Sequence, residues 1–110
     1  MKLQFTNNVV VHSAGQLSCA YPVVDACELA EVIVVLYDYM AFPRELPARN
    51  LFAYRPNGTL LWRAADIGHG PVDAYTNIIS EKPLVVGNFA GYECTVDVRT
   101  GQVRSTRFTK

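Results

Sequence analysis

Short apolar stretches rich in β-branched and aromatic residues recur along the chain, separated by short polar breaks, as is typical of β-strands and turns. Three equally spaced turn signals interrupt this pattern, Ala14-Gly15, Asn57-Gly58 and Thr100-Gly101, and each is flanked by β-branched and aromatic residues. Asn-Gly is the strongest signal, because a type I′ hairpin turn needs positive φ at both central positions. The pattern predicts eight strands, at about 22–28, 32–39, 50–55, 59–64, 75–80, 84–89, 92–99 and 102–108.

These strands form two units of four, in residues 22–64 and 65–108, and the N-terminal segment 1–21 can add one or two more. We therefore expect one domain over residues 1–110 with an all-β fold. Its predicted architecture is an antiparallel meander of about 8–10 strands that forms a two-sheet sandwich or a small barrel. The stretch VVDACELAEVI has enough Ala, Glu and Leu for a short helix, which is the alternative at that point.

Each unit ends in a strand pair closed by Asn-Gly or Thr-Gly, as in NLFAYRPNGTLLWRA and GYECTVDVRTGQV. Over residues 22–108 this four-stranded meander resembles a blade of a quinoprotein-type β-propeller. A ring needs about four or more blades. Because the chain has only two such units, the resemblance implies blade-like strands but carries no quinone cofactor or dehydrogenase activity onto any residue. The two units are expected to pack as a sandwich or barrel, with a ring of several chains as the other arrangement.

Counting from the last turn predicts which side chains face each other in the C-terminal hairpin. A two-residue turn at Thr100-Gly101 sets Asp97 against Arg104 on the solvent face. It also sets Val98 against Val103 on the buried face. The charged pair is expected to be a solvated ion pair that contributes at most about 1 kcal/mol.

Large apolar side chains occupy both faces of the hairpin at Asn57-Gly58, where Tyr54 is expected opposite Leu61. The strand at 32–39 is also apolar on both faces until its end, as in strands covered above and below. This much two-sided apolar surface in a short chain predicts a homodimer. Trp62, the only tryptophan, is either a core residue or part of an interface. The candidate interface residues are Phe42, Phe52, Tyr54 and Trp62.

Strand parity predicts where the loops lie, because connections in an up-and-down meander alternate between the two ends of the sheet. The tight turns then share one end, and the long loops 40–49 and 65–74 share the other end with 88–91. Loops gathered at one edge of a rigid sheet are where binding usually resides. Prolines such as Pro43 and Pro71 stiffen the long loops and lower the ordering cost of binding. The candidate binding residues are Tyr39, Arg44, Arg49, Asp66, His69, Asp73, Tyr75 and Asn88.

The charge balance argues against nucleic acid or an anionic membrane as the partner, because ten basic residues cancel ten acidic ones. The longest apolar run, 32–37, is too short for a membrane helix by a factor of about three. The N-terminus turns polar before a signal peptide could develop. We therefore expect a soluble, cytoplasmic protein. Its cysteines, Cys19, Cys27 and Cys94, lack metal-site spacing and are expected as reduced thiols, so no metal and no cofactor is predicted.

The sequence contains no nucleophile motif and no glycine-rich phosphate loop, which favours a non-enzymatic role. The leading interpretation is a small β protein that acts as a binding module for another protein or for a copy of itself. The alternative is a receptor for a small polar or anionic ligand over an apolar floor, held by Arg44, Arg49, Tyr39 and Asn88.

A third interpretation is a hydrolase-like enzyme. A carboxylate beside an imidazole can orient the ring and raise its basicity, and the loop at 65–74 contains such a set. The residues of this set are Asp66, His69 and Asp73.

Overall fold

Residues 1–109, which the computed structural model describes, form three antiparallel sheets joined in chain order. The N-terminal sheet has the order β1-β2-β3, with β1 (Gln4–Thr6), β2 (Val9–His12) and β3 (Gly15–Ser18). The central sheet has the order β4-β5-β6-β7, with β4 (Val23–Leu29), β5 (Val32–Tyr37), β6 (Leu51–Tyr54) and β7 (Leu60–Arg63). The C-terminal sheet has the order β11-β10-β9-β8, with β8 (Tyr75–Ser80), β9 (Leu84–Asn88), β10 (Tyr92–Val96) and β11 (Val103–Phe108). Two short 3-10 helices, η1 (Tyr39–Ala41) and η2 (Gly70–Val72), lie in the long loops.

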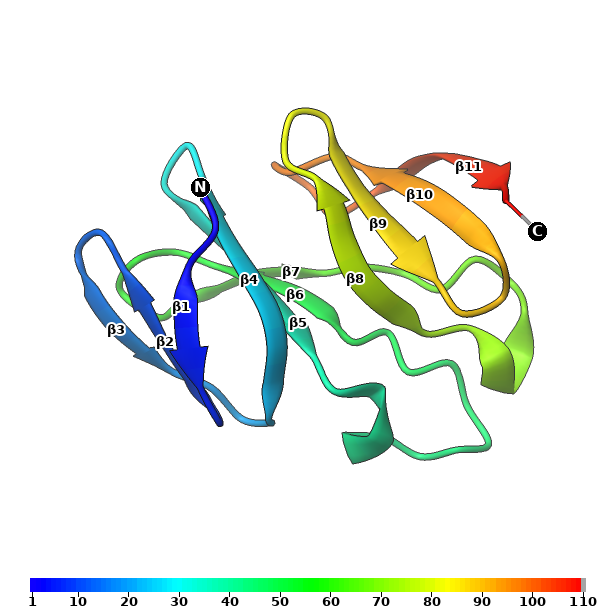
Figure 1. Ribbon diagram of the computed structural model, residues 1–110, viewed down its shortest axis with the longest axis horizontal. Helices are drawn as coiled ribbons and strands as arrows, with labels where there is room; N and C mark the ends of the chain where they lie inside the picture. Colours follow the sequence, from blue (N-terminus) through cyan, green and yellow to red (C-terminus); the bar gives the residue numbers. More distant parts are fainter. Residues whose placement is uncertain (110) are drawn as a thin grey trace.

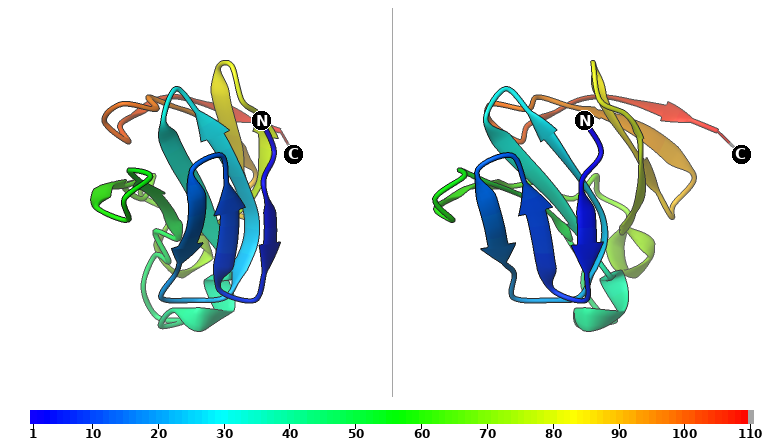
Figure 2. Two further views of the ribbon diagram at one scale, coloured as in Figure 1. Left: turned by 90° about the vertical axis from the view of Figure 1, so that its left-hand side faces the viewer. Right: turned by 60° about the vertical axis from the view of Figure 1, so that its left-hand side comes forward.

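The central sheet is covered on both faces, so the molecule has two apolar layers (Figures 1 and 2). Strand β5 illustrates the arrangement, because its successive side chains point to opposite faces. Val34 and Leu36 pack toward the C-terminal sheet. Ile33 and Val35 pack in the other layer, together with residues of β2 and β3. The two-sided apolar strand is thus buried within a single chain, and its pattern needs no second copy to explain it.

The expected fold class is confirmed: the structure is all-β and antiparallel, and it is compatible with a sandwich of sheets. The helical alternative is wrong, because residues 23–29 extend as β4. The N-terminal segment supplies three strands where one or two were expected. Over the described residues the sheets do not close into a propeller, and the likeness to quinoprotein blades stays a prediction.

Two hairpin registers differ from simple counting because each contains a bulge. Tyr54 lies opposite Leu60 rather than Leu61, since the register shifts between residues 53 and 54. In the C-terminal hairpin, Val103 lies opposite Val96 rather than Val98. There the turn is longer than two residues, because the backbone N–H groups at 97 and 101 bond to the carbonyls of residues 102 and 97.

The predicted ion pair between Asp97 and Arg104 forms despite the shifted register, with 2.6 Å between Arg104 Nη2 and Asp97 Oδ2. The bond from Arg104 lowers the pKa of the Asp97 carboxyl. The N–H of Arg99 also donates to this carboxylate. The pair therefore fixes the turn as well as bridging two strands.

Buried thiols and phenols lie between the sheets. Cys19, Cys27 and Cys94 are all free and buried. Burial raises the pKa of the Cys27 thiol to about 11, and it raises the pKa of the Cys94 thiol to about 11 as well. Burial also raises the pKa of the Tyr37 and Tyr75 phenols. These thiols and phenols therefore stay protonated in the folded protein at neutral pH.

The free energy of unfolding is therefore expected to fall as pH rises from 9 to about 11. Unfolded thiols ionise near pH 9.0, whereas the folded ones hold their protons to about 11, so below pH 9 the contribution is fully present. Each thiol contributes about 1 kcal/mol per pH unit in this window. Urea denaturation over this range measures the fall. Cys27→Ala is expected to make it shallower, and a free energy that stays level to pH 11 would contradict the account.

Candidate functional site

The two long loops meet at one end of the molecule, as strand parity predicts (Figure 1). We call this end, made of residues 38–50, 64–74 and 88–91, the rim. η1 starts the first loop, where the Asp38 carboxylate accepts a hydrogen bond from the Met40 N–H at 2.9 Å. The Ala48 N–H donates to the Asp73 carbonyl at 3.1 Å and ties the first loop to the second. The rim is therefore one connected surface.

Asn50 anchors the rim to two sheets. Its side chain is 0% exposed. The amide Nδ2 donates to the carbonyls of Tyr37 at 2.7 Å and Tyr75 at 2.8 Å, and Oδ1 accepts from the Tyr75 N–H at 2.9 Å. Asn50 was not among the predicted binding residues. Its side-chain bonds link it to the end of β5 and to the start of β8, so its role is to position the loop that follows β5 and the loop that precedes β8.

Asp73 organises the second loop from inside. Its carboxylate is on a residue 1% exposed, and Oδ2 accepts from the N–H groups of Ile67 at 2.7 Å and His69 at 3.0 Å. Oδ1 accepts from the Asn88 side-chain amide at 3.0 Å. Tyr75 is also buried, and its hydroxyl donates to the Ala65 carbonyl. The structure thus places Asp73, Tyr75 and Asn88, three predicted binding residues, in the supporting framework of the rim.

The hydrolase-like set is not assembled around the imidazole. The His69 ring packs against Tyr92, with 4.9 Å between ring centroids. The Asp66 carboxylate accepts from the Gly68 N–H at 3.1 Å. No hydrogen bond joins the His69 ring to Asp66 or Asp73 within residues 1–109. The described part of the chain also contains no group of three His, Cys, Asp or Glu residues that could hold a metal ion.

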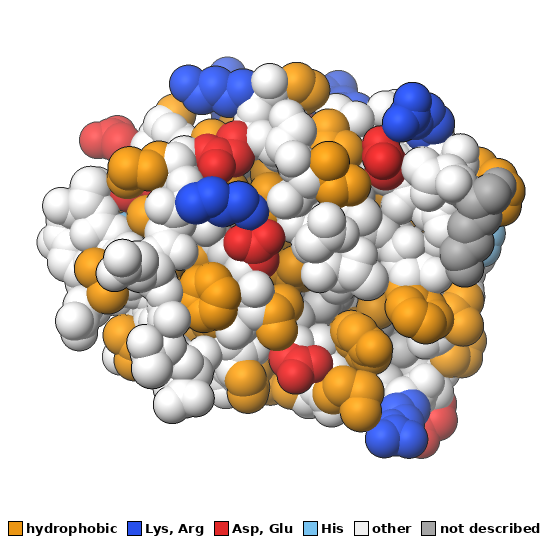
Figure 3. Space-filling model, in the orientation of Figure 1, with side chains coloured by type: hydrophobic (Ala, Val, Ile, Leu, Met, Phe, Trp, Pro, Cys, Tyr) orange, Lys and Arg blue, Asp and Glu red, His pale blue; other side chains and the backbone are white. Residues whose placement is uncertain are grey.

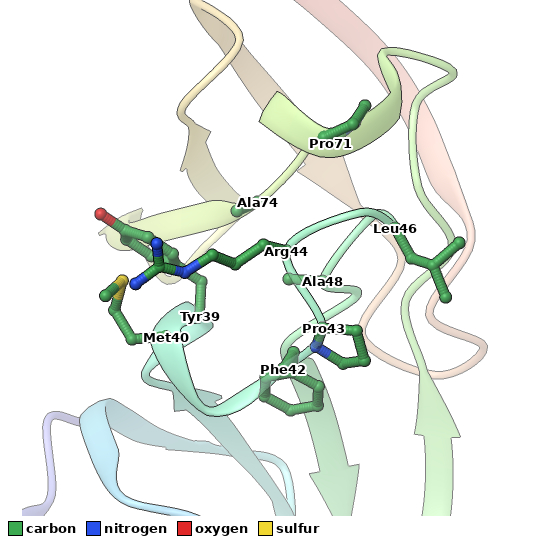
Figure 4. Close-up of a pocket in the computed structure, with 9 residues that line it drawn as sticks. All are labelled: Tyr39, Met40, Phe42, Pro43, Arg44, Leu46, Ala48, Pro71 and Ala74. Atoms are coloured by element: carbon green, nitrogen blue, oxygen red, sulfur yellow. The ribbon is translucent and has the colours of Figure 1, made fainter.

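A pocket of about 290 Å³ opens between the two loops (Figure 4). Phe42, Ala48 and Ala74 are its buried lining residues. The Arg44 side chain crosses the opening toward Tyr39 and Met40. Of the eight predicted binding residues, Tyr39 and Arg44 line the pocket. The remaining lining residues are Met40, Pro43, Leu46 and Pro71.

Several large apolar side chains in and near this pocket are exposed to solvent. We call them the rim patch: Tyr39, Met40, Leu46, Val72 and Phe89 are all exposed. The Tyr39 and Phe89 rings lie 6.1 Å apart and link the first loop to the β9–β10 connection. Figure 3 shows apolar side chains gathered at the lower right, over the long loops. The sequence signal for this patch was the presence of Met40, Leu46 and Val72 inside proline-containing loops.

The four candidate interface residues pack within the chain. Trp62 is 7% exposed, and its Nε1–H donates to the Val98 carbonyl at 2.8 Å. Phe42 is buried at the pocket floor. The Phe52 ring lies under the Arg63 guanidinium, 4.9 Å from its carbon, and Tyr54 shares a 2.6 Å hydrogen bond with the Tyr37 hydroxyl. These aromatic groups therefore contribute to packing within the chain, and Phe42 is the one of the four that lines the rim pocket.

The fold and the rim together define a small layered all-β protein with a loop-borne apolar recess. No helix in residues 1–109 has both the length and the apolar character needed to cross a membrane. The chain belongs to the family described as Domain of unknown function (DUF7957), whose model matches residues 1–108. No curated protein and no solved structure matches the chain.

Proposed function

We propose that this protein is a non-enzymatic binding module that docks another protein on the rim patch. The proposal rests on the exposed apolar side chains of the rim patch, of which Tyr39, Met40 and Leu46 line the pocket and Phe89 lies against Tyr39. Exposed apolar groups that are contiguous and rimmed by polar residues mark interaction sites. Burial of such a patch supplies about 25 cal/mol for each Å² removed from water, and this is the main favourable contribution to association.

The volume of the pocket favours a single side chain of a partner over a bound cofactor. Sites for small organic ligands span roughly 300–1,000 Å³. The rim pocket, at about 290 Å³, lies at the lower limit of that range. A large apolar side chain inserted into a desolvated pocket is the usual centre of a protein interface. We therefore assign the pocket to an apolar anchor residue of the partner.

The rim is held in place before any partner arrives. Asn50 and Asp73 fix the backbone of both loops through buried hydrogen bonds, and Pro43 and Pro71 restrict the chain at the pocket wall. A surface that is already ordered loses less conformational entropy when it binds. This supports docking on the rim in the conformation seen here.

A second recess, of about 370 Å³, opens at the tight-turn end between the central and C-terminal sheets. Its lining includes Leu29, Leu84 and Val96, which are buried side chains of the sandwich interior. None of the large apolar residues exposed in the described chain belongs to this lining. The rim is the better docking surface because its apolar groups already stand in solvent.

A heterologous partner is favoured over a second copy of the chain. A two-fold interface uses the same patch on both subunits. Pairing rim to rim would bring Arg44, Arg49 and Arg63 of both copies into one interface, where like charges oppose association. The free state of the three buried cysteines supports the cytoplasm as the compartment in which partner and protein meet.

Site-specific photo-crosslinking tests this proposal. A benzoylphenylalanine at position 46 is expected to trap a partner in cells that express the protein, whereas one at position 60 is not. Leu46 and Leu60 are matched controls, because they are 60% and 52% exposed and lie at opposite ends of the molecule.

The purified partner then gives a quantitative measurement. Leu46→Asp is expected to weaken its binding about tenfold or more, with the free energy of unfolding changed by no more than about 0.5 kcal/mol. Leu60→Asp is expected to leave binding unchanged. Equal crosslinking from positions 46 and 60 would refute the proposal, and a crosslink to a second copy would replace the heterologous partner with a homodimer.

A further inference from the structure

Three arginines lie at the rim or directly beside it at the end of β7, and none of them has an ion pair within residues 1–109. We call Arg44, Arg49 and Arg63 the rim arginines. Arg44 lines the pocket itself, and the Arg63 guanidinium lies 5.6 Å from the ring centre of Phe42, which forms the floor. The charges of Arg44 and Arg63 therefore border the place where the partner's apolar anchor is proposed to sit, and Arg49 adjoins Arg63.

The Arg63 guanidinium is held in a defined orientation, and some of its N–H groups remain free to donate to a ligand. Its guanidinium stacks on the rings of Phe42 and Phe52. Nε donates to the Arg49 carbonyl at 2.9 Å, and Nη2 donates to the Ala48 carbonyl at 3.0 Å. A guanidinium has five N–H donors, so three remain for a ligand. Such a pre-oriented planar fork matches the geometry of a carboxylate.

Arg49 lies next to Arg63, and its backbone has a φ of 47°. This left-handed conformation is uncommon for a residue with a side chain and persists only where surrounding contacts hold it. Its Nε donates to the Ala64 carbonyl at 3.3 Å, and the two Nη groups have no partner in the described chain. Burial lowers the pKa of Arg63, and the positive charge of Arg49 lowers it further. Two neighbouring cations are thus kept together without a compensating acid.

The rim contains four acids, and within the described residues none of them forms an ion pair with a rim arginine. Asp38 caps η1, Asp66 accepts from the Gly68 N–H, and Asp73 is buried in the loop framework. Glu45 is exposed and has no such bond within residues 1–109. Asp38, Glu45 and Asp66 keep their negative charges at the rim, but the described chain shows none of them bonded to Arg49 or Arg63, which lie side by side. The excess of positive charge is therefore local to this pair of arginines.

We infer that the partner presents an acidic segment to the rim, with its carboxylates at the rim arginines and an apolar residue beside them in the pocket. This inference rests on the proposed function, because it names the chemistry of the partner that the rim patch docks. Arginine pairs with a carboxylate through two parallel hydrogen bonds, which gives both attraction and orientation. An acidic apolar peptide is the ligand that satisfies the rim arginines and the pocket together.

Titration with a labelled random copolymer of glutamate and tyrosine tests the inference without knowledge of the natural partner. The protein is expected to bind this copolymer, and Arg44→Gln and Arg49→Gln are each expected to weaken binding about tenfold. Arg63→Lys retains the charge and the aliphatic stem but loses the fork, so it is expected to weaken binding by a similar factor.

Arg55→Gln is the matched control. Arg55 lies in the Asn57-Gly58 turn at the opposite end of the same hairpin, and the variant removes one positive charge. It is expected to change the affinity for the copolymer less than about twofold, since distant exposed charges are screened by salt. Circular dichroism of each variant reports whether the fold is retained, and Arg44, an exposed loop residue, provides the variant least able to disturb it.

Three outcomes would overturn the inference: absence of copolymer binding, equal loss in Arg55→Gln, or equal binding of a single-stranded oligonucleotide. The last result would reveal a general anion surface. Each is distinguishable from failure of the proposed function, because that function is tested by Leu46→Asp and crosslinking of the natural partner. If Leu46→Asp releases the partner while Arg44→Gln and Arg49→Gln do not, the rim patch remains the docking site and its partner is not acidic.

Discussion

Replacing Trp62 by alanine is expected to lower the free energy of unfolding by about 3–5 kcal/mol, because the substitution leaves a large cavity in the core. The indole packs between the central and C-terminal sheets, and its Nε1–H donates to the Val98 carbonyl. Gly101 lies against the ring so closely that an added Cβ would be 2.5 Å from Trp62 Cδ2. The indole therefore joins β7 to the turn between β10 and β11.

Urea denaturation of Trp62→Ala and Trp62→Phe measures this effect. The phenylalanine variant retains much of the ring volume and loses the hydrogen bond, so it is expected to lose only about 1–2 kcal/mol. The two variants separate packing from hydrogen bonding. If Trp62→Ala weakened partner binding while the free energy of unfolding stayed within about 0.5 kcal/mol, the side chain would belong to an interface, contrary to its place in the core.

Replacing Asp73 by alanine is expected to lower the free energy of unfolding by about 3 kcal/mol or more. The carboxylate accepts from the N–H groups of Ile67 and His69 and from the Asn88 amide. Removing it leaves three donors without an acceptor in a site that is 1% exposed. The same change is expected to release the loop at 64–74 and weaken docking on the rim.

Asp66→Ala is the matched control for this prediction. Asp66 lies in the same loop, but it is exposed and accepts one backbone hydrogen bond, so its loss is expected to cost no more than about 0.5–1 kcal/mol. Asp73→Asn should give an intermediate value, because its amide oxygen can still accept while its NH2 group opposes a donor. Thermal unfolding and urea denaturation of the three variants check the order, and equal losses in Asp66→Ala and Asp73→Ala would contradict it.

The strand pattern of the two four-stranded units could be read directly from the sequence. Residues 32–37 and 84–88 fall inside predicted strands, and the Gly turns lie where the pattern places them. Alternation and turn chemistry act over a few residues, so they are visible in a local window. The bulges at Tyr54 and Val96 were missed because a bulge depends on how two strands meet across the sheet.

The sequence around β5 also could not show which part of the structure covers this strand, whose two faces are both apolar. The alternation of Ile33, Val34 and Val35 shows that both faces are buried, but it does not identify the covering layer. A second copy and a sheet from the same chain would each cover such a face. The short strands in residues 1–21 form that layer here, since Val10 and Leu17 pack against β5.

Loop position was predictable for the rim, but side-chain direction was not. Asp73 and Asn88 have the residue types of a binding site, yet their polar atoms turn inward to loop backbone and to each other. Met40 and Leu46 have the residue types of a core, yet they stand in solvent. A single sequence does not show which loop residues satisfy the backbone and which face outward, because that depends on the folded path of the loop.

Asn50 restricts how the recognition surface of such a protein can diversify. Its bonds tie the end of the first rim loop to backbone groups of two sheets, so a change in the path of that loop at Asn50 would break buried hydrogen bonds. New specificities would have to arise by exchange of outward side chains such as Leu46 and Val72, on an unaltered main-chain template. The rim would then work as a fixed frame with interchangeable contact residues.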